Sequence, residues 1–310
     1  MSKEYTIAFY NVENLFDPIN DPSTDDNDFL PNSRKRWTAK RYRHKLYKLS
    51  KAIASIGQTD DPPVIVGLAE VENKKVLKDL VSQKELKPFQ YSFIHFNSPD
   101  ERGIDVALLY QKKSVAITSA EPYAVDLTDD HGVKDYSRDI LKIALRLADE
   151  QIHILVNHWS SRREGAGETE YKRVVAAQKV NGITTQITEN YPNAKIIVMG
   201  DFNDNPHSKS IQILENGSQL YNPFETVWTP SKGSLNYKFK WLMFDQILLS
   251  HNFLDINQTG LKFRNADVAN DAELSQYHGK FKGQPFRTYV GKKYFGGYSD
   301  HFPVYVRLYA

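Results

Sequence analysis

Eight short apolar runs, each long enough for one strand and most of them rich in β-branched residues, are distributed over the whole 310-residue sequence. Runs of this length, bounded by polar and turn-forming residues, are typical of buried β-strands. No internal repeat or linker-like change of composition separates them, so we expect one sheet system in a single domain, residues 1–310. The runs are residues 6–10, 64–68, 106–110, 140–147, 152–156, 196–199, 246–249 and 304–308.

Two helices are predicted between these strands, which places the chain in the α/β class. Apolar residues recur at spacings of three and four over 37–56, and a second amphipathic pattern covers 168–190, with Pro192 just beyond it. The first helix also carries a series of Lys and Arg side chains, Lys45 among them. We interpret this series as a solvated helix face and not as a phosphate-binding stripe.

Two further segments are predicted as loops. Residues 17–32 are rich in Asp, Asn and Pro but lack a full EF-hand pattern of ligands, so we expect a solvated loop there. In residues 262–297, basic and aromatic side chains are interleaved. This pattern is equally consistent with contact to phosphates plus stacking and with aromatics that pack the loop onto the core.

The overall charge and the lack of cysteine exclude several kinds of site. A formal net charge of +2 gives no global basic field of the type that marks many nucleic-acid binders. Without cysteine there are no disulfides, thiolate metal sites or cysteine nucleophiles. No signal peptide or transmembrane run is visible, so we expect a soluble monomer, cytoplasmic as the sequence stands or exported if a signal peptide has been removed.

The most specific local feature is the end of the 196–199 strand. The apolar run stops at Gly200, which permits a tight turn or a close backbone approach, and is followed by Asp201 and Asn203. Ligands bind beyond the carboxyl ends of strands in open α/β sheets, so this Asp-x-Asn is a candidate site. An ordinary turn built by Asx side chains is the alternative.

Polar residues at the ends of the other strands suit metal-assisted hydrolysis of a phosphate ester. Asn11, Glu70 and Asp300 offer hard oxygen ligands, which favour Mg²⁺ or Mn²⁺. The Zn-protease, nucleophile-elbow, Walker A and dinucleotide-binding motifs are all missing from the sequence. Singly, each strand-end residue is more often structural than catalytic.

Roles follow from the side-chain chemistry. Asp201 can orient or deprotonate the attacking water, and Asn203 can donate to the phosphate. His158 and His301 can carry a proton near neutral pH if carboxylates orient them. We predict Asp245 as the partner of His301 and Asp105 as that of His158. The predicted substrate-binding residues are Arg102, Arg138, Trp159 and Arg162, and Arg163 is also available as an anion donor.

Six motifs, taken in order and with their spacing, resemble the endonuclease/exonuclease/phosphatase family over nearly the whole chain. The family includes pancreatic deoxyribonuclease, abasic-site endonucleases, bacterial sphingomyelinases and inositol polyphosphate phosphatases. The motifs are Tyr10-Asn11-Val12-Glu13-Asn14-Leu15-Phe16, Gly67-Leu68-Ala69-Glu70-Val71-Glu72, Asn157-His158-Trp159, Gly200-Asp201-Phe202-Asn203, Phe244-Asp245 and Ser299-Asp300-His301-Phe302-Pro303.

The resemblance implies a four-layer α/β/β/α sandwich, with two packed mixed β-sheets, helices on the outer faces and a divalent-metal phosphoesterase site at one end. It also implies that Glu70 and Asn11 belong to the metal site, with Asp300 near the same ion. Asp201 and Asn203 are then the residues that orient water and bind phosphate. Asp245 and His301 are implied to form a dyad. His158 resembles the second histidine of the deoxyribonuclease and sphingomyelinase branches. Abasic-site enzymes have tyrosine at about that place, which argues against an abasic-site role.

Substrate identity stays open at this point. Our first hypothesis is a divalent-metal-dependent phosphodiesterase that hydrolyses nucleic acid. The alternatives are a phosphatase or phospholipase-like hydrolase of an inositol phosphate or sphingomyelin type of substrate, and, remotely, a non-catalytic binding module. A net-basic groove next to Asp201 would favour nucleic acid, whereas a narrow pocket walled by aromatics of the 262–297 segment would favour a small phosphoester.

Overall fold

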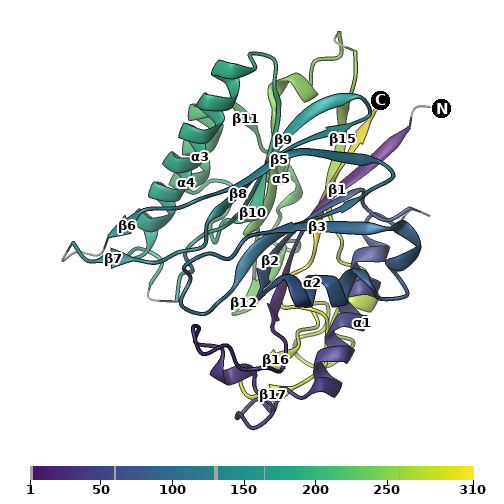
Figure 1. Cartoon of the computed structure of the whole chain (residues 1–310), viewed down its shortest axis with the longest axis vertical. Helices are drawn as coiled ribbons and strands as arrows, with labels where there is room; N and C mark the ends of the chain where they lie inside the picture. Colours follow the sequence, from purple (N-terminus) through teal and green to yellow (C-terminus); the bar gives the residue numbers. More distant parts are fainter. Residues whose placement is uncertain (1–2, 59–60, 129–131, 164, 258) are drawn as a thin grey trace.

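The structure is a computed structural model, and it describes residues 3–58, 61–128, 132–163, 165–257 and 259–310. Two six-stranded mixed sheets pack face to face, with helices on their outer sides (Figure 1). The predicted four-layer α/β sandwich is confirmed. Among the described residues, no helix is long and apolar enough to cross a membrane.

The first sheet, sheet A, is assembled from both ends of the chain. Its strand order is β15-β18-β1-β2-β4-β3, in which β1 is parallel to β2 and antiparallel to β18. The strands are β1 Glu4–Leu15, β2 Ile65–Val71, β3 Tyr91–His95, β4 Asp105–Gln111, β15 Lys262–Val268 and β18 Val304–Tyr309.

The second sheet, sheet B, comes from the middle of the chain. Its order is β11-β14-β10-β9-β8-β5, and β9 and β10 form its parallel pair. The strands are β5 Val115–Tyr123, β8 Ile140–Leu147, β9 Glu150–His158, β10 Lys195–Asp201, β11 Leu220–Tyr221 and β14 Asp245–Ser250.

Three short hairpins and several helices complete the described fold. The hairpins pair β6 Leu127–Thr128 with β7 Lys134–Asp135, β12 Leu235–Tyr237 with β13 Lys240–Leu242, and β16 Tyr289–Val290 with β17 Lys293–Tyr294. The helices are α1 Ala39–Ser55, α2 Lys74–Val81, α3 Glu170–Asn190, α4 Lys209–Gly217 and α5 Phe224–Val227, with 3-10 turns at Asn27–Phe29, Lys87–Phe89, His251–Phe253 and Ala272–Leu274.

The residues between Lys195 and Gly200 in strand β10 are all apolar because both faces of the strand are covered. Ile197 and Met199 belong to the core between the sheets, while Ile196 and Val198 pack with α3 and α4 on the outer face of sheet B. A strand covered on both faces needs no alternation of polar and apolar residues. The two sheets approach closely at Gly67 of β2, where a Cβ atom would lie 2.5 Å from Met199 Sδ and 3.0 Å from Phe9 Cδ2.

All eight predicted strands and both predicted long helices are present, and the differences are local. The segment 262–297 is not entirely a loop, because its first residues form β15 on the edge of sheet A. The edge strands β3 and β5, and helices α2 and α4, were not predicted. Sheet edges and short helices are only partly buried, so their sequences lack a continuous apolar pattern.

Candidate active site

Three of the predicted residues form a row across one end of sheet B. Asp201, the last residue of β10, lies in register with His158 of β9 on one side and with Asp245 of β14 on the other. All three are at most 4% exposed. Strand β10 continues through Gly200, and a Cβ atom there would lie 2.5 Å from the Asn157 carbonyl oxygen. Gly200 therefore serves close backbone approach and not a turn.

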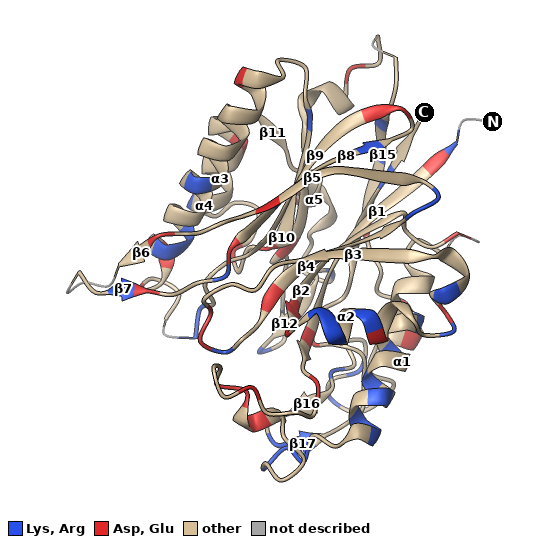
Figure 2. Cartoon of the chain, in the orientation of Figure 1, with Lys and Arg blue, Asp and Glu red and all other residues tan. Residues whose placement is uncertain are grey.

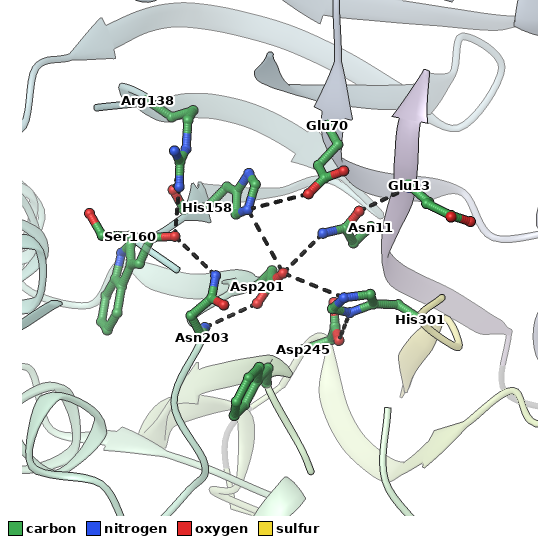
Figure 3. A network of polar contacts seen from close by, with 12 residues as sticks. Asn11, Glu13, Glu70, Arg138, His158, Ser160, Asp201, Asn203, Asp245 and His301 are labelled. Carbon is green, nitrogen blue, oxygen red and sulfur yellow. Dashed lines mark hydrogen bonds and ion pairs between the residues drawn. The ribbon is translucent and has the colours of Figure 1, made fainter. Parts of the chain in front are cut away.

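His301 completes a carboxylate–histidine dyad with this row. Its Nδ1 lies 2.6 Å from Asp245 Oδ2, and its Nε2 lies 3.9 Å from Asp201 Oδ2 (Figure 3). Burial alone would lower the pKa of His301, but the carboxylates of Asp245, Asp201 and Asp300 outweigh it and raise that pKa well above its ordinary value. The predicted His301–Asp245 pair is thus present, with His301 held as a cation.

His158 lies on the other side of Asp201 in the opposite electrostatic situation. Its Nε2 is 3.8 Å from Asp201 Oδ2 and 3.9 Å from Glu70 Oε1. Burial, reinforced by Arg138 and Arg102, lowers the pKa of His158 well below its ordinary value, so this histidine is neutral. Burial and the adjacent Asp245 raise the pKa of Asp201 to about 7.

Sheet A faces this row with Asn11 and Glu70. Asn11 Nδ2 donates to Asp201 Oδ2 at 2.9 Å, and Asn11 Oδ1 accepts from the Glu13 amide at 3.0 Å. Glu70 has a φ of 65° at a register shift between β2 and both of its neighbours, a bulge that re-aims its side chain out of the strand. Its Oε2 accepts from the Asn14 amide at 2.9 Å.

Asp300 lies beside the dyad, in the segment that precedes the last strand, β18. Arg287 donates to its Oδ2. Burial raises the pKa of Asp300, but the positive charges of His301 and Arg287 outweigh this and lower it below its ordinary value. The carboxylate is therefore ionised.

Several predicted substrate-binding residues instead support the site from behind. Arg138 donates to the carbonyls of His158 and Trp159 and to Asp100, and Arg162 donates to the Asn203 carbonyl and to Asp204. Trp159 is 2% exposed and packs edge-on against Phe202. The prediction that Trp159 contacts substrate is wrong, and Arg138 and Arg162 position the backbone instead of offering free donors.

The predicted contacts of Arg102, Arg163 and Asn203 with substrate stay predictions. Arg102 donates to Asn14 Oδ1 at 2.8 Å, near Glu70, and Arg163 is exposed at the rim of the site. Asn203 has a φ of 51° and is buried, with 8% of its surface exposed. It donates one N–H to the Trp159 carbonyl at 3.0 Å. Its second amide hydrogen has no partner among the described residues and is available to a phosphate oxygen.

The prediction that Asp105 orients His158 is wrong. Asp105 lies 3.1 Å from Nε2 of His95, a buried histidine on β3, and accepts from Ser98. Asp105 reaches His95 because β3 and β4 are neighbouring strands of sheet A, and Glu70 of β2, not Asp105, is the sheet A carboxylate near His158. The Nδ1 of His158 is buried with no hydrogen-bond partner among the described residues.

A buried Lys45–Glu13 pair was missed by sequence reasoning. Figure 2 shows Lys and Arg along α1, but Lys45 is 1% exposed, contrary to the solvated-face interpretation. It donates to Thr288 Oγ1 and the Tyr298 carbonyl, each at 2.6 Å, and lies 4.0 Å from Glu13 Oε2. Lys45 is three residues after Tyr42 and four before Leu49, so its position on the apolar face was the available signal.

Glu13 anchors the segment that carries Arg287. Its carboxylate accepts from the amides of Thr288 and Tyr289. Burial and the nearby Asp300 raise the pKa of Glu13 to about 7. Together with Lys45, this residue fixes the segment before Asp300 against β1 and α1.

Two hollows of opposite character adjoin the site. A cavity of about 160 Å³ lies next to Asp300 and Glu13, and its lining includes Lys35, Arg163, Arg287, Phe29, Trp37 and Tyr289. A wider one of about 560 Å³ is lined by acidic residues, among them Asp21, Asp25, Asp100 and Glu101. Of these two hollows, the smaller is lined by Lys and Arg side chains, and the wider one is not.

Comparisons with known proteins agree with this geometry. A model of the Endonuclease/Exonuclease/phosphatase family matches residues 6–310. A comparison with curated proteins finds no match. The fold is similar to that of an endonuclease/exonuclease/phosphatase family protein from Bacteroides thetaiotaomicron, with 18% identity, a TM-score of 0.65, and coverage of 100% of this chain and 96% of that chain.

Two further solved structures share the fold. A mannosyl-6-phosphatase of the same species has 18% identity, a TM-score of 0.62, and coverage of 98% of this chain and 99% of that chain. TDP2 of D. rerio, solved in complex with single strand DNA product, has 14% identity, a TM-score of 0.58 and coverage of 98% of both chains. Because the family model extends over nearly the whole sequence, the chain belongs to the endonuclease/exonuclease/phosphatase family, whose members are metal-dependent hydrolases of phosphoester bonds.

Proposed function

We propose that the protein is a divalent-metal-dependent phosphodiesterase that cleaves nucleic acid. The observation that carries the proposal is the pair of histidines around Asp201, with Nε2 atoms 3.8 Å and 3.9 Å from the same carboxylate oxygen. One of them is neutral and the other is cationic, as judged from the directions of their pKa shifts. Groups of opposite protonation state suit a reaction that activates water and protonates a leaving alkoxide.

Glu70, Asn11 and Asp300 are the residues that we propose hold the cation, Mg²⁺ or Mn²⁺. Their oxygens are hard donors, Asp300 is ionised, and no thiolate competes. A bound divalent cation would neutralise charge on a phosphoryl oxygen. Asp201, Asp245 and His301 also bring ligand atoms within 4.8 Å of one another, but His301 and Asp245 already pair with each other through a 2.6 Å contact, which suits their proposed role as a dyad.

The roles of the remaining side chains follow from where they lie. Asp201 orients or deprotonates the attacking water, since its pKa of about 7 lets it accept a proton near neutral pH. His301, held charged by Asp245, donates to the phosphate or the leaving oxygen. Asn203 donates its free amide hydrogen to the phosphate, and neutral His158 faces the same space across Asp201.

Nucleic acid is our first choice of substrate because of a structural neighbour, since the proton that His301 carries suits the departing alkoxide of a phosphodiester and of a phosphomonoester alike. The D. rerio TDP2 structure, similar in fold, holds a single strand DNA product.

A small phosphoester is the second candidate, and a specific observation favours it. The 160 Å³ cavity beside Asp300 is narrow, is walled partly by Tyr289 from the 262–297 segment, and contains three cationic side chains, Lys35, Arg163 and Arg287. Such a cavity fits one compact phosphorylated group. The fold of the B. thetaiotaomicron mannosyl-6-phosphatase is compatible with this alternative.

A hydrolysis panel tests the proposal. Plasmid DNA, single-stranded DNA, RNA, a phosphodiester dye, a phosphomonoester dye, sphingomyelin and inositol phosphates are each incubated with Mg²⁺, Mn²⁺ or a chelator. We expect metal-dependent cleavage of nucleic acid and of the diester dye, with loss of both in His158→Ala but not in the exposed control His251→Ala. A preference for the monoester dye or inositol phosphates, with nucleic acid uncut, would transfer the function to the second candidate.

A further inference from the structure

Three large aromatic side chains are exposed together at the end of the molecule that carries the active site. Tyr237 and Phe239, in the β12–β13 hairpin, are 60% and 62% exposed, and Phe281, in the 277–283 loop, is 40% exposed. Phe239 and Phe281 stack with ring centroids 5.9 Å apart and planes 6° from parallel. Exposed apolar groups in a cluster mark interaction sites more often than scattered ones do.

Lysines alternate with these aromatics in both segments. We call this set the hairpin surface: Tyr237, Lys238, Phe239, Lys240, Lys280, Phe281 and Lys282, all of them exposed. Lys238 Nζ lies 5.2 Å from the centre of the Tyr237 ring and Lys280 Nζ lies 4.9 Å from that of Phe281. Residues 235–242 and 276–286 include no Asp or Glu. The surface therefore combines flat apolar faces with uncompensated positive charge.

The tip of the hairpin adopts a backbone conformation that its residues disfavour. Lys238 and Phe239 have φ values of 49° and 64°, as in a type I′ turn, where Asn-Gly is the usual pair. A non-glycine residue in this region costs about 1–2 kcal/mol. Retaining Lys and Phe at these two positions keeps a cation and a ring at the tip, where they contribute nothing to the core.

The base of the same hairpin is fixed to the catalytic dyad. Leu235 forms a β-bridge with His301, and Ser234 Oγ accepts from the amide of Asp245 at 3.2 Å. Trp241 stacks on Phe302, with ring centroids 6.0 Å apart. At about 3.3 Å per strand residue, the tip lies about 10 Å beyond the base. The surface is thus rigidly placed close to His301.

We infer that the hairpin surface binds single-stranded nucleic acid next to the scissile phosphate, an inference that rests on the proposed function. Aromatic rings stack on unpaired bases of any sequence, and lysines neutralise the phosphates between them. A duplex keeps its bases stacked on one another and offers no free faces to these rings. The surface explains how a chain with a formal net charge of only +2 can hold a polyanion.

The aromatic residues of the 262–297 segment differ in how far they are exposed to solvent. Tyr289 is 7% exposed, and Phe286 and Tyr294 pack against the central core. Phe281, in contrast, is exposed and stacks on the hairpin. Part of the segment thus serves packing, and Phe281 is the exposed ring that meets the hairpin, while Tyr277 and Phe295 are exposed outside the hairpin surface, at 55% and 39%.

The test compares binding and catalysis in the same variants. A fluorescent 12-nucleotide single strand and a blunt duplex of equal length are titrated in chelator, and the diester dye is hydrolysed with Mg²⁺. We expect Phe239→Ser/Phe281→Ser to weaken single-strand binding at least about tenfold, because each stacked base contributes about 1–3 kcal/mol. Turnover of the dye stays within twofold of the wild type. Tyr191→Ser, a 50% exposed aromatic outside this surface, is the matched control.

The outcomes separate this inference from the proposed function. Unchanged single-strand affinity in the double variant, or equal wild-type affinity for strand and duplex, overturns the inference even if DNA is cleaved. The inference is also overturned, in favour of a lipid surface, if the wild type binds anionic vesicles and the double variant loses that binding but still binds the oligonucleotide. If the wild type cleaves neither nucleic acid nor the dye, the proposed function fails, while the affinities still decide the role of the surface.

Discussion

Replacing Asp201 with asparagine should stabilise the metal-free protein while impairing catalysis. Asp201 is 2% exposed, and burial plus the neighbouring Asp245 raise its pKa from 3.8 to about 7. The folded state therefore holds the Asp201 proton more tightly than the unfolded chain does. The contribution of Asp201 to stability therefore falls as pH rises from about 4 to about 7, because the folded protein must ionise this buried group.

The size of the effect follows from these values. A tenfold change in proton affinity corresponds to about 1.4 kcal/mol, so ionising Asp201 costs about 4 kcal/mol of stability above pH 7. Asparagine still accepts from the Asn203 amide but loses the bond from Asn11 Nδ2, which costs about 1 kcal/mol. We expect Asp201→Asn to be about 3 kcal/mol more stable than the wild type at pH 8 and nearly equal to it at pH 5.

Urea unfolding in chelator at pH 5, 6, 7 and 8, followed by tryptophan fluorescence, measures this difference. The matched control is Asp204→Asn, an equally buried carboxylate that accepts from Arg162 and Arg173. Removing its charge leaves Arg173 buried and unpaired, so this control should lose about 3–5 kcal/mol. An Asp201→Asn protein no more stable than wild type at pH 8, or one with the same difference at every pH, would refute the reasoning.

Three further predictions concern catalysis and packing. His301→Ala and Asp201→Ala should each reduce the turnover of any substrate that the wild type cleaves at least about a hundredfold. Circular dichroism should show that both variants are folded, and folded variants with unchanged rates would show that these residues are not catalytic. Chelator should abolish activity and Mg²⁺ or Mn²⁺ should restore it, whereas activity that survives chelation would exclude the metal assignment. Gly67→Ala should lower the free energy of unfolding by about 1–3 kcal/mol, because its Cβ would meet Met199 Sδ. Adding Met199→Ala should relieve part of that loss, and strictly additive effects would contradict this contact.

The central strands were predictable because their burial on both faces leaves an unbroken apolar signal. Residues 196–199 are an example, with alternate side chains in two different cores. The edge strand β5 has exposed residues along most of its length, and β15 runs through Arg264 and Asn265. Such strands form because a neighbouring strand is present to pair with, and this information is not local.

The polar centre of the site was predictable from residue type and strand position, but its supporting contacts were not. Asp201 and Asp245 meet as expected because the register of β10 and β14 brings them together, and His301 contacts Asp245 from the segment before β18. Pairing of Asp105 with His95 and burial of Trp159 depend on which sheet each strand joins. A motif identifies a residue without showing which sheet carries it.

Sheet A contains strands from both ends of the chain, and this affects the order in which the protein folds during synthesis. Its middle strand, β1, must wait for β18, which is made nearly three hundred residues later and follows directly after Asp300 and His301. Until then the edge of β1 that pairs with β18, Glu4–Phe9, is unpaired, and all of these residues except Glu4 are buried in the finished protein. On the proposed function, a ribosome-bound chain that contains every strand of sheet B but lacks Asp300 and His301 would not cleave substrate. It is also most exposed to edge-to-edge aggregation, so a chaperone would be needed chiefly during this interval.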